Sequence, residues 1–472
     1  METCSGDQSF ELRDRQVGAQ TPGVATPTAI VPGVGGSTQP RQFRNVLAAI
    51  VLSGLAIRVV YVLLVTRHEH GKFYDAFWYA LTGSELAHGQ FFRDSFLNQP
   101  TASHPPLTSV LLAPASLVFG VKPGLTPQRL TMVVLGTAVI LCVGLLGRAV
   151  AGPWVGLTAA GLAAVAPNFW IPNGILMSET LAMLLMVLIL LAVVRVLRAP
   201  TFGNAALLGA AIGFEALVRA ELILFLPCLL LPAALAARNQ APMRRLALFG
   251  VGALVTLVVL APWVGRNLVV FKDPTYLSTG IGGTLLGSNC PQVYSGPDIG
   301  GWNVVCSAQT SGSDESVQSS RATHAAIQFA DRHSHRVPLV VLARVARLWD
   351  VIHPIRAARE QVGEGRPLPE ALAGLGFYYL LIPLGVAGVV ILRRRRLHQW
   401  FLLVPAGALT LVSAAFFGQT RFRAPFEVCL VVLAAPALVL LAQRLFQRRT
   451  NAQPADVGPT DSTPIGEAFF KN

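Results

Sequence analysis

The stretch NVLAAIVLSGLAIRVVYVLLV, residues 45–65, decides the fold class of this protein. It contains one charged side chain, Arg58, and is otherwise almost entirely apolar. A helix crosses the hydrocarbon core of a bilayer with about 20 mostly apolar residues. The whole chain of 472 residues is 53% hydrophobic and only 13% charged, with a mean hydropathy of +0.55, whereas soluble domains carry about 25% charged residues. The sequence therefore predicts an all-α, polytopic integral membrane protein.

About ten segments are apolar enough to be transmembrane helices. They are 45–65, 128–147, 153–170, 178–196, 204–217, 219–237, 246–264, 376–392, 400–417 and 424–443. One further apolar segment, 105–120, is short and begins with prolines. Counting it as a span would move the basic residues that follow it to the other side of the membrane. We therefore expect it to lie at the outer membrane surface or to re-enter the membrane.

The net charge of +13 comes almost entirely from arginines, which are not gathered in one polar domain as nucleic-acid binding would require. They flank the predicted spans instead, and short positive loops stay inside the cell. With the N-terminus inside, ten spans place the following on the cytoplasmic side: Arg41, Arg44, Arg148, Arg195, Arg198, Arg238, Arg244, Arg245, Arg393, Arg394, Arg395, Arg396, Arg444, Arg448 and Arg449. The pattern predicts a multi-pass plasma-membrane protein with two long outer loops, 66–127 and 265–375.

The two ends of the chain differ in composition from the part between them. Residues 1–40 are rich in Gly, Pro, Thr and Gln and lack an apolar core, so we expect a disordered cytoplasmic tail. Residues 450–472 form a second short polar tail, expected to be disordered in the cytoplasm. The membrane domain is predicted to occupy residues 41–449.

Two of the six cysteines, Cys290 and Cys306, fall in a predicted outer loop. An oxidising exterior permits a disulfide there. The alternative, a metal site, lacks further His or Cys residues at ligand spacing. The sequence favours a structural disulfide between the two.

Unusual polar residues collect at the outer ends of the predicted spans and in the first outer loop. They are Asp75, His104, Glu179, Arg219, Glu221, Arg266, Asn267, Arg421 and Arg423. Arg58 lies within the first span, about two helical turns from its outer end. Ionisable groups at membrane depth are costly and usually line a cavity or a pathway. These residues are our candidate site.

Several candidates also have a structural explanation. Glu179 follows Ser178 and can cap the helix that starts there. Arg219 can pair with Glu215, four residues earlier on the same helical face. Arg58 can extend its side chain toward the interface.

The remaining candidates have similar alternatives. Asp75 can be a solvated loop residue, although its aromatic neighbours in FYDAFWY (73–79) favour a position at the membrane interface. His104 precedes two prolines and can belong to a rigid turn. Arg421 and Arg423 can simply flank the membrane.

Taken together, carboxylates face several arginines at the outer surface. Arginine binds phosphate through charge-assisted hydrogen bonds in a fixed geometry. A carboxylate within reach of a hydroxyl can remove its proton. This combination indicates group transfer from a lipid-linked phosphate.

At this point the sequence resembles a known family. The segments YDAFWYALTGSELAHG (74–89) and HPPL (104–107) are similar to the first-loop motifs of the GT-C membrane glycosyltransferases. The branch they resemble contains protein O-mannosyltransferases and bacterial lipopolysaccharide sugar transferases. Later landmarks with the same resemblance are 166–185, 209–227 and 261–271, and 285–306 looks like an actinobacterial variety. The resemblance covers roughly residues 45–445.

The resemblance implies an inverting transfer from a polyprenyl-phosphate sugar to an extracytoplasmic glycan, lipid or protein. The family's first-loop aspartate, a general base or metal contact, maps onto Asp75, and its second acidic position onto Glu179. Its contacts to the donor phosphate have these candidates: Arg58, Arg219, Arg266 and Arg421. A divalent cation, Mg²⁺ or Mn²⁺, could assist at the leaving phosphate.

One departure from the family and two rival functions remain. Many relatives carry an acid directly after the aspartate, where this chain has Ala76, which favours Asp75 acting alone. A transporter or flippase of a lipid-linked anion would also place arginines in a membrane cavity, but it should show matched halves with interrupted helices. A non-catalytic scaffold would keep the fold without the chemistry.

Overall fold

The computed structural model describes residues 39–66, 74–94, 98–121, 125–307 and 314–451. The chain divides into two units, Met1–Pro32 and Gly33–Asn472, and everything below concerns the second. The expected disordered tails lie outside the described residues, apart from 39–40 and 450–451, and so does Phe73 of the FYDAFWY segment.

Helices make up the secondary structure of the described residues, with no strand beyond an isolated bridge between Arg93 and Pro100. The α-helices are α1 Pro40–Val60, α2 Tyr74–Ala87, α3 Leu107–Phe119, α4 Thr126–Ala151, α5 Pro153–Val165, α6 Pro167–Ile175, α7 Glu179–Arg198, α8 Phe202–Ala216, α9 Leu231–Leu235, α10 Pro242–Val270, α11 Ile281–Ser288, α12 Pro291–Tyr294, α13 Val304–Ser307, α14 Glu315–Arg332, α15 Val337–Leu348, α16 Pro354–Glu360, α17 Leu368–Arg394, α18 Trp400–Ala415 and α19 Ala424–Asn451. The 3₁₀ and π turns are η1 Tyr61–Val65, η2 Ala220–Leu224, η3 Leu226–Leu230, η4 Gly296–Asp298, η5 Ser334–Arg336, η6 Gln361–Glu364 and η7 Thr420–Arg423.

Six helices among the described residues are long and apolar enough to cross a membrane. They are Pro40–Val65, Thr126–Ala151, Glu179–Arg198, Pro242–Val270, Leu368–Arg394 and Thr420–Leu445. The pair α5 and α6, bent by 45° at a break, makes a seventh if it is one span. The prediction of an all-α polytopic membrane protein is confirmed.

The three other predicted spans correspond to shorter apolar helices, at Phe202–Ala216, Ala220–Leu235 and Trp400–Ala415. At 15 residues, α8 is about 22 Å long, less than the ~30 Å hydrocarbon core. The segment 105–120 forms α3, 13 residues from Leu107 to Phe119, which is also too short to cross.

Two helices form the centre of the bundle. In the most apolar stretch of α7, 72% of the residues are buried, and in that of the span containing α19, 78% are buried. The corresponding share in α1 and in α10 is 28%. Close packing depends on glycine, because a Cβ on Gly388 of α17 would lie 1.6 Å from the Leu433 carbonyl oxygen of α19. The central helices therefore fix the positions of their outer ends.

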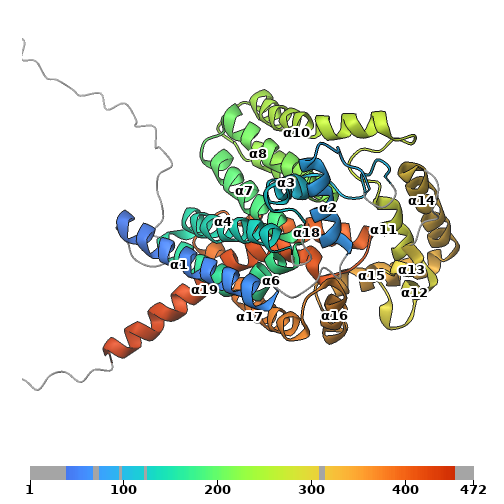
Figure 1. Ribbon diagram of the computed structural model, residues 1–472. Coiled ribbons are helices and arrows are strands. Elements are labelled where there is room, and N and C mark those ends of the chain that lie inside the picture. The colour runs from blue at the N-terminus through green and yellow to red at the C-terminus, as the bar shows by residue number, and fades with distance from the viewer. Residues whose placement is uncertain (1–38, 67–73, 95–97, 122–124, 308–313, 452–472) are drawn as a thin grey trace, which may run out of the picture. The chain divides into compact units, whose positions relative to one another are not determined.

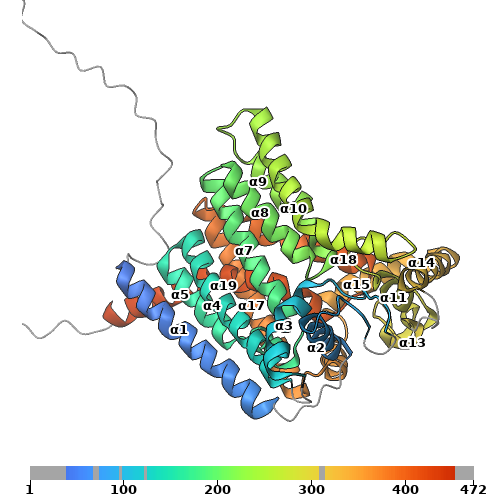
Figure 2. The same ribbon diagram turned by 45° about the horizontal axis from the view of Figure 1, so that its top comes forward.

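The described parts of the two predicted outer loops fold over one end of this bundle. Figures 1 and 2 both show α11–α15 gathered on one side, with α2 and α3 between them and the long helices. At the other ends of the helices, Arg148 of α4 lies 4.5 Å from the ring of Phe43 in α1, and Arg198 of α7 donates to the Ala149 carbonyl. The start of α1 and the ends of α4 and α7, all of which carry arginines, therefore lie together at the end of the bundle that is predicted to face the cytoplasm.

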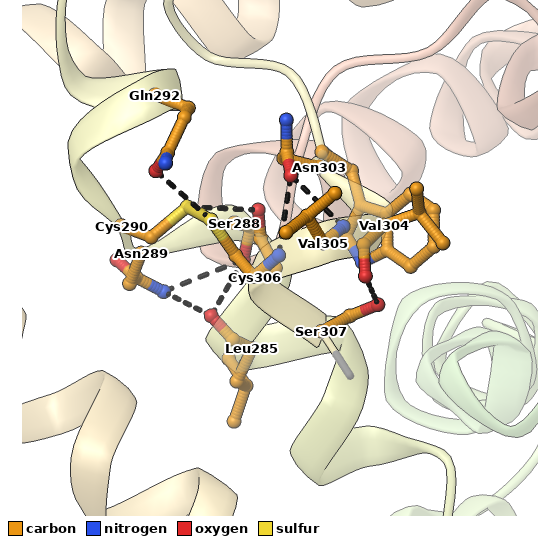
Figure 3. The surroundings of a disulfide bond; sticks show 12 residues. Leu285, Ser288, Asn289, Cys290, Gln292, Asn303, Val304, Val305, Cys306 and Ser307 are labelled. Atoms are coloured by element: carbon orange, nitrogen blue, oxygen red, sulfur yellow. Dashed lines mark hydrogen bonds between the residues drawn. A yellow bond between two sulfur atoms is a disulfide. The ribbon is translucent and has the colours of Figure 1, made fainter. Parts of the chain in front are cut away.

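The second outer loop contains a disulfide between Cys290 and Cys306 (Figure 3). It joins the start of α12 to α13, and Asn303 caps the short helix α13 by accepting from the backbone N–H groups of Val305 and Cys306. The bridge closes a compact part of the loop, where Val293 and Tyr294 pack with Val340 of α15 in a small apolar core.

Candidate active site

Arg421, on η7, is the centre of the candidate site. Its Nη1 donates to Asp75 Oδ2 at 3.2 Å. Its Nε lies 3.5 Å from Glu364 Oε1 and 3.9 Å from Glu179 Oε1. One guanidinium thus contacts carboxylates from α2, α7 and η6, which are far apart in the sequence.

Two of these carboxylates stand at helix N-termini. Asp75 is in the first turn of α2, and Glu179 is the first residue of α7, after the left-handed turn at Leu176 that ends α6. The unpaired N–H groups of a first helical turn favour negative charge. Glu179 is only 1% exposed, and Arg219 and Arg421 provide the nearby positive charge that its burial requires.

His104 lies on the other side of Asp75. Its Nε2 is 3.7 Å from Asp75 Oδ1, and its ring contacts those of Trp78 (4.7 Å) and Tyr79 (5.2 Å). Burial raises the pKa of Asp75, but His104 and Arg421 outweigh it and the pKa falls below its usual value. Burial lowers the pKa of His104 despite the opposing effect of Asp75. At neutral pH Asp75 is therefore ionised and His104 neutral.

Arg219, in the turn between α8 and η2, completes the cluster. Its Nε donates to Glu221 Oε1 at 2.9 Å, and its Nη1 lies 3.7 Å from Glu179 Oε1. Its guanidinium also lies 4.7 Å from the ring of Phe422. The Arg421 cluster, as we define it, consists of Asp75, His104, Glu179, Arg219, Glu221, Glu364, Gln419 and Arg421.

The structure places Arg58 outside this cluster. It is fully buried and donates to four backbone carbonyls, those of Gly54, Ala163, Ala164 and Phe169. Two of these belong to the last turn of α5, where the break before Pro167 leaves carbonyls without a helical donor. Arg58 therefore has a structural reason to lie at membrane depth, since lipid offers such carbonyls no hydrogen bonds.

Arg266 and Asn267 also make backbone contacts. Arg266 donates to the carbonyls of Phe92 (2.9 Å) and Thr101 (3.0 Å) in the first outer loop. Asn267, fully buried, donates to the Tyr276 carbonyl at 3.2 Å. Both residues thus hold the outer loops at the end of α10.

Arg423 lies next to the cluster but belongs to a separate buried network. It pairs with Asp350, donates to Glu427 Oε1 at 2.8 Å and lies 3.6 Å from the ring of Tyr378. Asn168 of α6 donates to the same Glu427. This network joins α6, α17, α19 and the end of α15, and it holds η7, and with it Arg421, in place.

Sequence reasoning missed Glu364 and Gln419. Gln419 donates to Glu364 and accepts from Arg421 Nε at 2.9 Å. Glu364 lies in a polar stretch, EQVGEGRP (360–367), where no apolar neighbours mark it. The only local signal is Gly365 with a φ of 96°, which turns the chain directly after Glu364.

The side chains at this site do not fit a divalent cation. Within the described ranges, no three His, Cys, Asp or Glu residues come close enough together to hold an ion. The carboxylates of Asp75, Glu179 and Glu364 converge on the guanidinium of Arg421, which would repel a cation. The cation implied by the resemblance stays a prediction, and no step below depends on it.

Comparisons with known proteins agree with the resemblance. Residues 103–265, which include His104, Glu179 and Arg219, match the family model described as dolichyl-phosphate-mannose-protein mannosyltransferase. No curated protein matches the chain significantly.

Among solved structures, the oligosaccharyltransferase of Archaeoglobus fulgidus in the apo form has a TM-score of 0.52 and 18% identity. The alignment covers 88% of this chain and 52% of that one. The same enzyme tethered with an acceptor peptide has the same TM-score and identity, with 88% and 51% covered. ArnT from Cupriavidus metallidurans bound to undecaprenyl phosphate has a TM-score of 0.39 and 17% identity, with 88% and 81% covered.

This chain spans about half the length of the oligosaccharyltransferase chain that it matches. At such low identity, that likeness concerns the fold alone. The resemblance of this protein to the GT-C membrane glycosyltransferases is confirmed, in sequence over residues 103–265 and in fold over most of the chain.

Proposed function

We propose that this protein is a glycosyltransferase that moves a sugar from a polyprenyl-phosphate donor to a glycan, lipid or protein acceptor outside the cytoplasm. The observation that carries the proposal is the Arg421 cluster, where the ionised Asp75 and two arginines share one partly buried site. The description of the matched family names a lipid-phosphate sugar, which supports this donor class.

Asp75 is the general base in this proposal. A base must be ionised before it can accept a proton, and the lowered pKa of Asp75 meets that condition at neutral pH. When a donor phosphate engages Arg421, the guanidinium is drawn from Asp75, and the pKa of Asp75 rises. The carboxylate thus becomes more basic when the donor is present.

The reaction is a single displacement. The acceptor oxygen forms a bond to the anomeric carbon while the bond from that carbon to the phosphate oxygen breaks, which inverts the carbon. The acceptor proton passes to Asp75, and the lipid phosphate leaves with the electron pair. Arg421 and Arg219 stabilise the charge that develops on it.

Other residues of the cluster position the reactants. Glu179, almost fully buried, keeps Arg219 and Arg421 close together. His104, only partly buried beside Trp78 and Tyr79, is placed to contact the sugar or the acceptor hydroxyl. Because the basic helix ends lie at the other end of the bundle, we place this site on the outer face of the plasma membrane.

The test is transfer by purified protein from a panel of radiolabelled polyprenyl-phosphate sugars, with identification of the labelled product. Asp75→Asn keeps the size of the side chain but cannot take the proton, so transfer should fall by about 10²-fold or more. Donor binding should change little, because the arginines hold the phosphate. Asp331→Asn, an exposed carboxylate of α14, is the matched control and should transfer normally.

The rival functions give different results. A transporter would move the lipid-linked donor across vesicles without forming a labelled product. A scaffold would do neither. Transfer by Asp75→Asn at the wild-type rate would refute the assignment of the base.

A further inference from the structure

Glu364, like Glu221, is a carboxylate of the Arg421 cluster to which the proposed reaction gives no role. Its Oε1 accepts from Gln419 Nε2 and lies 3.5 Å from Arg421 Nε. Its other oxygen, Oε2, is buried and has no hydrogen-bond partner among the described residues. An ionised carboxylate is costly in such surroundings, whereas a neutral carboxyl group is not.

The charges around Glu364 do not balance if every carboxylate is ionised. The carboxylates of the cluster are Asp75, Glu179, Glu221 and Glu364. The cations that face them are Arg219 and Arg421, together with Arg366, which acts on Glu364 and also donates to Gln361 Oε1 at 3.0 Å. Four negative charges would meet three positive ones, and the neutral His104 adds none.

The contacts indicate which carboxylate carries the proton. Glu179 lies within 4 Å of two arginines, and Asp75 accepts a hydrogen bond from Arg421 and faces His104. Glu221 accepts from Arg219 at 2.9 Å and is 25% exposed. The buried oxygens of Glu179 also lack hydrogen-bond partners, but two guanidinium groups balance its charge. Glu364 shares Arg421 with the others, and its Oε2 is sealed from solvent without a partner.

We propose that Glu364 is a positioning residue that carries a proton while Asp75 is ionised, and that it thereby leaves the charge of Arg421 to Asp75 and to the donor phosphate. The role of the donor phosphate in this inference rests on the proposed function. The protonation of Glu364 does not depend on that function. A neutral Glu364 still accepts the hydrogen bond from Gln419, which in turn accepts from Arg421 Nε.

The electrostatics agree with this geometry. Burial raises the pKa of the Glu364 carboxyl; Arg421 and Arg366 oppose it, while Glu179 and Asp75 raise it further. Burial raises the pKa of Asp75, but His104 and then Arg421 lower it, and the pKa of Asp75 lies below its usual value. Two carboxyl groups whose surroundings push their pKa values apart are the usual signature of one protonated and one ionised partner.

The proposal has a consequence for catalysis. As the pH rises, Glu364 loses its proton and competes with the donor phosphate for Arg421. The KM for the donor should therefore rise over the pH range in which Glu364 ionises, while kcat, which depends on Asp75, should change less.

The first experiment does not depend on transfer. Because folded Glu364 binds its proton more tightly than the unfolded chain, it lowers stability as the pH rises from the unfolded pKa of about 4.3 toward the folded pKa. Thermal unfolding in detergent should thus lose stability over this window in the wild type. The loss should be smaller in Glu364→Gln, which mimics the neutral carboxyl. An equal loss in both proteins would overturn the proposal.

The second experiment measures transfer against pH for Glu364→Gln, Glu364→Ala and Glu360→Gln, a more exposed carboxylate four residues earlier. In Glu364→Gln, the KM for the donor should not rise over the pH range in which Glu364 of the wild type ionises. Glu364→Ala should lose the bond from Gln419 and weaken donor binding at every pH, and Glu360→Gln should keep the wild-type profile. A loss in Glu364→Gln as large as that in Asp75→Asn would show that the ionised form is needed.

The two experiments separate this inference from the proposed function. If the wild type transfers no sugar but Glu364→Gln still removes part of the pH dependence of stability, the proposed function fails and the protonated Glu364 stands. If transfer occurs but the KM rises with pH equally in both proteins, the inference fails alone.

Discussion

At the scale of single residues, the arginines of this protein differ in what they bind. Arg421 and Arg219 contact carboxylates in a partly exposed cluster, where an incoming phosphate can compete for them. Arg58 and Arg266 bind backbone carbonyls, and Arg423 binds buried carboxylates. Only the first kind has charge that a ligand can share without unfolding its surroundings. We therefore assign the donor phosphate to Arg421 and Arg219.

A substitution of Arg58 tests this division. Arg58→Leu leaves the carbonyls at the break between α5 and α6 without donors, and each buried unpaired group costs about 1–3 kcal/mol. We expect a lower thermal unfolding temperature in detergent but unchanged donor affinity in the folded protein. Leu52→Ala, on the exposed face of α1, is the control for loss of side-chain volume. Weaker donor binding at full stability would instead support a role for Arg58 in the site.

At the scale of elements, hydrogen bonds to Glu315 of the second outer loop hold the first outer loop in place. Glu315, in the first turn of α14, accepts from Thr101 Oγ1 (2.7 Å), Ala102 N (2.9 Å) and Thr279 Oγ1 (2.7 Å). The segment before His104 is further tied by the bond from Thr279 N to the Ala102 carbonyl. The position of His104 against Asp75 therefore depends on α14.

Glu315→Gln should weaken these hydrogen bonds between the two loops. An amide is neutral and has one acceptor oxygen, so the charge-assisted bonds weaken, and the bond that meets the NH₂ group must reverse or break. We expect faster hydrogen exchange around residues 98–106 and slower transfer. Thr279→Val, which removes one bond, should have a smaller effect.

Asp331→Asn, on an exposed turn of the same helix, should leave both measurements unchanged. If Glu315→Gln exchanged and transferred like the wild type, α14 would have no part in positioning the first loop.

At the scale of the whole molecule, the helices place two chemically different ends on the bundle. Basic residues lie at one end of α4 and α7, whereas the Arg421 cluster lies at the N-terminus of α7 and the start of the span containing α19. A membrane that surrounds the apolar stretches of the long helices would separate these two ends. The excess of arginine at the first of these ends predicts that this end faces the cytoplasm.

Cysteine labelling tests this orientation. Gln90→Cys and Ser334→Cys, both exposed in the outer loops, should react with an impermeant thiol reagent in intact cells. Arg394→Cys, at the end of α17, should react only after the cells are permeabilised. The parent protein is the control for its native cysteines. Labelling of Arg394→Cys alone in intact cells would reverse the topology and place the Arg421 cluster inside.

The sequence by itself determined the fold class and the approximate positions of the long apolar helices. Insertion into a membrane depends on the local apolar content of a segment and on the charges beside it, and both are visible in the chain. For the same reason, the span 178–196 was predicted almost as it occurs in α7, Glu179–Arg198. The sequence also drew attention to Asp75, Glu179, Arg219 and Arg421, because ionisable groups beside apolar segments are unusual.

Only the tertiary structure decided which of these residues meet. Asp75 and Arg421 are 346 positions apart, and their contact depends on how α2, α7 and η7 pack at one end of the bundle. Glu364 reaches Arg421 from a polar turn with no local signature. The sequence grouped Arg58 with the site, but in the structure it binds backbone carbonyls at the break between α5 and α6. Local composition specifies a helix, but the partner of a polar side chain is set by long-range packing, because a charge buried in that packing must be paired where the chain brings it.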